Sequence, residues 1–99
     1  MKLSKEAKKI QDAILKEYDI NDEAGLAILK TGMESYDLMQ KSQKIVERDG
    51  LTVAGDRGGI KAHPLLAVIR DSRGQFLMAL KHLNLDLEPV KGIGRPPGR

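Results

Sequence analysis

The chain has 99 residues and no cysteine, and 17 Lys and Arg residues against 14 Asp and Glu residues leave a net charge of +3. This length suits one domain with a modest hydrophobic core, and the lack of cysteine excludes disulfides and thiolate metal sites. No apolar run approaches the roughly 20 residues that span a bilayer, and a signal peptide core is lacking, so we expect no membrane contact.

The first predicted helix runs from about Ser4 to Tyr18, because Ser4 is a suitable N-cap and apolar residues follow at helical spacing. The apolar arc contains Leu3, Ala7, Ile10, Ile14 and Tyr18. Lysines fall on the opposite side at Lys2, Lys5, Lys9 and Lys16. These lysines could contact DNA phosphates, or they could simply keep an amphipathic helix in solution.

The second predicted helix begins after Asn21 or Asp22 and runs to Asp49, where Gly50 stops it. Two apolar seams lie side by side along it. One seam holds Leu26, Leu29, Met33 and Tyr36, and the other holds Ile28, Gly32, Met39 and Val46. Two seams imply two packing partners. Gly25 and Gly32 are unfavourable inside a helix, which indicates either close approach of another helix or a kink.

Residues 51–62 have weak strand character on both sides of a glycine-rich turn. Leu51 to Ala54 and Ile60 to Ala62 flank this turn, which contains Arg57. The pattern fits a small β-hairpin or an ordered loop, because two isolated strands are only marginally stable.

The third predicted helix follows His63-Pro64, since proline suits the first turn of a helix and His63 would lie at its cap. Its apolar face includes Leu65, Leu66, Val68, Ile69, Phe76, Leu77, Ala79, Leu80 and Leu83. Arg73 lies in the middle of this face and needs a carboxylate or solvent. We therefore expect an all-α fold in which a long central helix packs antiparallel to a long third helix, after a short N-terminal helix.

The two seams and the small core together predict a homo-oligomer. The expected interface residues are Leu29, Gly32, Met33, Tyr36, Met39 and Arg73. We assign residues 1–88 to a helical domain and residues 89–99 to a flexible tail rich in Gly, Pro and Arg. Within this tail Arg95 lies between glycine and proline, as in half of an AT-hook, although a disordered tail would also contain such a residue.

Catalytic chemistry is not indicated by any motif. The glycines at 55–59 lack the Lys and Ser or Thr of a phosphate-binding loop. His63 and His82 lie far apart in sequence and form no metal-ligand or triad pattern. We therefore expect no enzymatic activity, no cofactor and no metal.

The order of features resembles that of the small terminase subunits of tailed phages. A long helix ends at Asp49-Gly50, an apolar run and glycine-rich turn lead to His63-Pro64, and a second long helix closes with Leu83-Asn84-Leu85 and Glu88-Pro89. Many members of the family have Leu-Gly-Leu at that last position, and Asn84 preserves the helix stop because asparagine tolerates the left-handed conformation.

The resemblance implies a DNA-packaging protein of the host cytoplasm. Such subunits assemble into rings, recognise the packaging start on phage double-stranded DNA, and pass it to a large subunit with ATPase and nuclease activities. Expected DNA contacts are Lys2, Lys5, Lys9, Lys16, Arg57, Lys61 and Arg95. Two alternatives stay open, which are a helical module that acts through the large subunit without touching DNA, and a small DNA-binding regulator.

Overall fold

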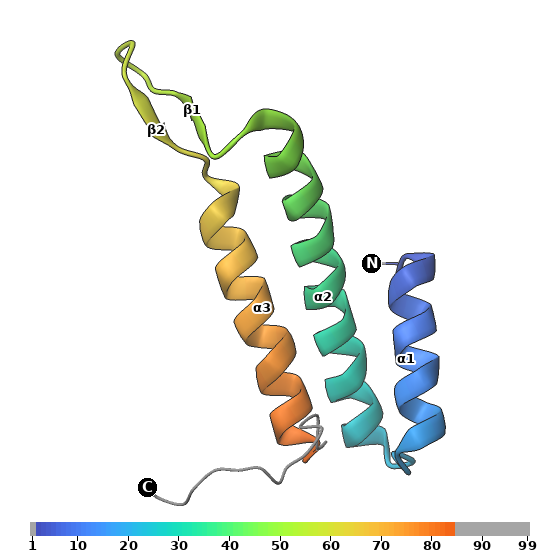
Figure 1. Cartoon of the computed structure of the whole chain (residues 1–99). Coiled ribbons are helices and arrows are strands. Elements are labelled where there is room, and N and C mark those ends of the chain that lie inside the picture. The colour runs from blue at the N-terminus through green and yellow to red at the C-terminus, as the bar shows by residue number, and fades with distance from the viewer. Residues whose placement is uncertain (1, 85–99) are drawn as a thin grey trace, which may run out of the picture.

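A computed structural model describes residues 2–84. It contains the helices α1 (Lys5–Glu17), α2 (Glu23–Asp49) and α3 (Leu65–His82), and the strands β1 (Thr52–Ala54) and β2 (Ile60–Ala62). Figure 1 shows α2 between the other two helices, antiparallel to both, with the strands projecting beyond the end of α2. The expected all-α architecture is therefore confirmed, and the segment between α2 and α3 is a hairpin. Within residues 2–84, no helix combines the length and apolar character that crossing a bilayer requires.

Local sequence signals set the helix ends. The Ser4 hydroxyl accepts a hydrogen bond from the Ala7 N–H at 3.1 Å, and the Asp22 carboxylate accepts one from the Gly25 N–H at 3.2 Å. Gly50 ends α2 with a φ of 94°, a conformation that glycine adopts without steric cost. Asn84 ends α3 with a φ of 59°, as the sequence predicts for this position.

Both seams of α2 find partners within the chain. Leu29 and Met33 form the buried core with Ala7 of α1. On the second seam, a Cβ at Gly32 would come within 2.7 Å of the Ala79 Cβ of α3. Gly32 is therefore explained by the close approach of α3. Gly25 faces its own capping segment instead, since a Cβ there would meet Asp22 and Ile20 at 2.9 and 3.0 Å.

The apolar face of α3 is only partly buried. Antiparallel packing on α2 predicts that Ile69, Phe76 and Leu80 are buried. Ile69 and Leu80 are buried, but Phe76 is half-buried, so the prediction for Phe76 is wrong. Its ring packs against Tyr36 at a centroid distance of 5.2 Å, and this pair lies at the edge of the core. Leu77 is exposed, because the predicted face is wider than the surface that α2 covers.

Candidate nucleic-acid interface

The lysines of α1 form an exposed basic surface. Lys2, Lys5, Lys9 and Lys16 are all exposed, whereas Ala7 on the other side of the helix is fully buried. None of these lysines forms an ion pair within residues 2–84, where the ion pairs found join Arg48 to Asp49 and Arg70 to Asp71. Lys8 is also exposed and lines a shallow depression on α1 together with Lys5 and Lys9, so the predicted set omitted one available cation.

A buried carboxylate fixes α1 on α2. Asp37 is only 3% exposed and accepts two hydrogen bonds from Ser4, from the backbone N–H at 2.7 Å and from the hydroxyl at 2.6 Å. In the sequence, Asp37 lies at helical spacing from Lys30, Glu34 and Lys41, which predicts a position on a solvated polar stripe of α2, and this prediction is wrong. A buried carboxylate needs hydrogen-bond donors, and the start of α1 supplies them. The lysine surface is therefore held in one orientation relative to α2.

The hairpin presents the second set of predicted contacts. β1 and β2 pair in antiparallel register, with Thr52 opposite Ala62 and Ala54 opposite Ile60. Arg57 lies in the turn between the strands, Lys61 lies on β2, and both are exposed. The turn closes with Gly58 at a φ of 82°, which favours glycine.

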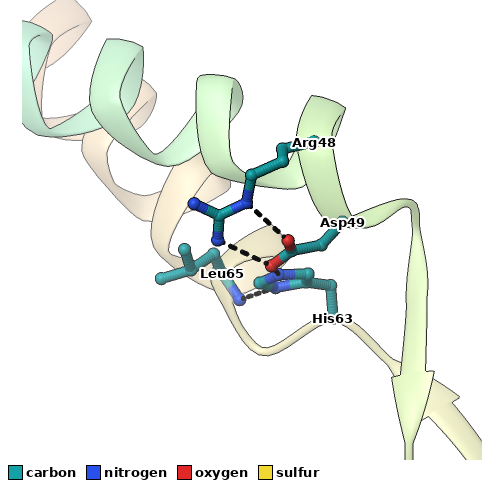
Figure 2. Close-up of polar contacts among 4 residues, drawn as sticks. All are labelled: Arg48, Asp49, His63 and Leu65. Carbon is teal, nitrogen blue, oxygen red and sulfur yellow. Dashed lines mark hydrogen bonds and ion pairs between the residues drawn. The ribbon is translucent and has the colours of Figure 1, made fainter.

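A histidine joins the hairpin to the ends of both long helices (Figure 2). The buried His63 ring accepts a hydrogen bond from the Leu65 N–H through Nδ1 at 3.1 Å, which caps α3. Because Nδ1 accepts, the proton lies on Nε2, which donates to the Asp49 carboxylate at 3.0 Å. Arg48 donates to the same carboxylate at 2.8 Å. This cluster links the end of α2 to the start of α3 at the base of the hairpin.

The pH dependence of unfolding should reveal how much Asp49 contributes to stability. Two hydrogen-bond donors, Arg48 with the larger effect and His63 with the smaller, lower the pKa of Asp49 from 3.8 to about 2. A carboxylate with a depressed pKa contributes stability above its ordinary pKa, and that contribution disappears as the pH falls from about 4 to about 2. Asp49→Asn should therefore lose less stability than the wild type between pH 5 and pH 2, as measured by urea unfolding monitored by circular dichroism.

Arg48→Gln is the matched variant, because it removes the main cause of the shift and keeps the carboxylate. It should show a pH dependence between those of the wild type and Asp49→Asn. Identical pH profiles for all three proteins would contradict the role assigned to the cluster.

The structure does not bring the two basic surfaces together. α1 reaches only the level of Asp37 and Gln40 on α2, as the bonds from Ser4 and between Gln40 and Glu6 show. The nine residues that follow Gln40, up to Asp49, add about 14 Å of helix before the hairpin begins. Figure 1 accordingly shows the hairpin beyond the end of α2 and away from α1. Arg95 lies outside the described residues.

The expected interface residues occupy different environments. Leu29, Gly32 and Met33 are buried, Tyr36 and Met39 are half-buried, and Arg73 is exposed to solvent. Their burial within one chain neither requires nor excludes a second copy, so the interface stays a prediction. Among residues 2–84, no three His, Asp or Glu side chains are grouped to hold a metal ion.

Comparison with known proteins gives a family match over most of the chain. The family described as phage terminase, small subunit matches residues 5–93. No curated protein and no solved structure shows significant similarity. The match covers all three helices and the hairpin.

Proposed function

The chain belongs to the phage terminase small subunit family and has a role in phage DNA packaging, and from this premise we propose that it binds viral DNA at the packaging start. In this proposal a homo-oligomer of the chain delivers the DNA, in the host cytoplasm, to the large ATPase and nuclease subunit. The chain itself acts as the non-catalytic subunit and needs no cofactor.

The basic surface of α1 is the observation that carries the proposal. Lys5, Lys9 and Lys16 project into solvent from one rigid helix and have no carboxylate partner among the described residues. Such cations are free to replace the counterions of DNA phosphates, which supply most sequence-independent affinity. Lys2 extends the surface, while Arg57 and Lys61 offer a second contact through the hairpin. Arg95 would be a further contact.

The salt dependence of DNA binding tests this assignment. Each phosphate contact contributes about one unit to the slope of log affinity against log salt concentration. Replacing Lys5, Lys9 and Lys16 with alanine should therefore lower the slope by about three units and weaken binding at low salt. Fluorescence anisotropy with labelled double-stranded phage DNA at several salt concentrations measures both quantities.

A matched control removes the same charge from another helix. Lys30, Lys41 and Lys44 are exposed on α2, and their triple alanine variant should retain most of the wild-type slope. If both variants lost the same amount of DNA affinity and salt slope, the effect would come from total charge. If the α1 variant kept the wild-type slope, α1 would not be the DNA contact.

A second candidate is a module that contacts only the large subunit. Exposed apolar residues on the hairpin favour it, since Ile60 is 78% exposed and Leu51 is 66% exposed. Failure of the wild-type protein to retain phage DNA at low salt would favour this candidate. The regulator alternative is less well supported, because α2 packs against α1 and α3 and is not free to act as a recognition helix.

A further inference from the structure

An open apolar groove lies between α2 and α3. It has a volume of about 840 Å³ that is open to solvent, and its walls include Ala27 and Ile28 of α2 and Met78 and Ala79 of α3. No residue of α1 lines it, because α1 packs over Leu29 and Met33 on another side of α2. Met78 is 52% exposed in this groove. The groove thus keeps apolar side chains in contact with water within the described part of the chain.

Gly74 lines the same groove and has no explanation within the described chain. Glycine in the interior of a helix is unfavourable by roughly 1 kcal/mol relative to alanine. At Gly32 the close approach of Ala79 explains the glycine, but apart from its chain neighbours and the adjoining backbone of α3, no described atom lies within 4 Å of a Cβ built at Gly74. A missing side chain beside an apolar groove allows another molecule to approach the backbone of α3 closely.

The corner between α1 and α2 has properties complementary to the groove. Leu15 in the last turn of α1 and Leu26 in the first turn of α2 are both exposed. Four exposed acidic residues lie between these leucines in the sequence, against one exposed cation, Lys16, so the corner is net acidic; they are Glu17, Asp19, Asp22 and Glu23. The rim of the groove carries Arg70, Asp71 and His82, and Lys81, the residue before His82, is exposed. The cations Arg70 and Lys81 outnumber Asp71, so this rim is net basic. Arg70 also contacts Asp71 at 3.3 Å, but this pair is exposed and contributes little.

We propose that the α1–α2 corner of one copy of this chain docks into the α2–α3 groove of a second copy. The inference rests on the proposed homo-oligomer and names the two surfaces that build it. Leu26 fills the space beside Gly74 and Met78, while the acidic residues of the corner face the basic rim. The contact joins two different surfaces. A dimer therefore has one unoccupied groove and one unoccupied corner, and each can bind a further copy.

Blocking the groove tests the proposal without disturbing the fold. Gly74→Gln adds a side chain in open space and replaces glycine with a better helix former, so its melting temperature should equal or exceed that of the wild type at concentrations where neither protein assembles. The same variant should nevertheless sediment as a monomer at concentrations where the wild type is assembled. Leu26→Lys, which places a cation against the basic rim, should also sediment as a monomer.

Mixing the two variants identifies which surfaces meet. The Gly74→Gln chain keeps an intact corner and the Leu26→Lys chain keeps an intact groove, so an equimolar mixture should form a dimer and no larger species. Contact between two identical grooves would instead let Leu26→Lys assemble by itself.

Two results would overturn the proposed contact, and only the second would also overturn the homo-oligomer. If Gly74→Gln keeps the wild-type assembly mass, the groove is not the contact, although the homo-oligomer itself stands. If the wild-type chain is a monomer at high micromolar concentration, the proposed homo-oligomer fails as well. DNA binding by α1 is a separate proposal, and the salt slope tests it independently.

Discussion

Met33→Ala is expected to lower the free energy of unfolding by about 2–5 kcal/mol, the range for truncating a fully buried large side chain. Met33 is 0% exposed and lies with Leu29 and Ala7 where α1 packs on α2. Truncation removes apolar contacts to both helices and leaves a cavity that the surrounding backbone can fill only partly. This range is a large part of the stability typical of a small domain.

Chemical denaturation monitored by circular dichroism measures the loss. Met78→Ala is the matched control, because Met78 is half-exposed on α3 and should cost less than about 1 kcal/mol in the isolated chain. Met39→Ala should fall between the two, since Met39 is half-buried. Similar losses at Met33 and Met78 would mean that the described core does not hold α1 on α2.

Gly32→Ala should destabilise the chain, although the same change at Gly74 should stabilise it. A methyl group at Gly32 would come within 2.7 Å of the Ala79 Cβ, which forces α2 and α3 apart. Such overpacking costs typically 1–3 kcal/mol, and the roughly 1 kcal/mol of improved helix propensity offsets only part of that. At Gly74 the propensity gain acts alone, because the space beside it is open within the described residues.

Because Gly32→Ala and Gly74→Ala are expected to change the free energy of unfolding in opposite directions, the two variants should be measured under identical conditions. Unfolding is best compared at concentrations where neither variant assembles, since self-association adds to apparent stability. A stabilising effect at both positions would show that α2 and α3 are not in close contact at Gly32.

The sequence by itself determined the three helices and their order, and the structure decided that a hairpin joins the last two. Ser4, Asp22 and Gly50 mark helix ends that the structure confirms, because capping depends on side chains and backbone conformations within one turn of the chain. His63 is at the start of α3 for the same local reason. The family was also recognisable, since the order of helices, turn and proline is a property of the chain alone.

Only the tertiary structure decided which side chains meet. The sequence pattern treated Asp37 as solvated, yet it is buried because the donors of Ser4, 33 residues away in the chain, satisfy its carboxylate. Gly32 and Gly74 look alike in sequence, and they differ because Ala79 approaches one and no described atom approaches the other. Periodicity predicts that a residue lies on an apolar face, but the distance and angle to the neighbouring helix determine how much of that face is covered.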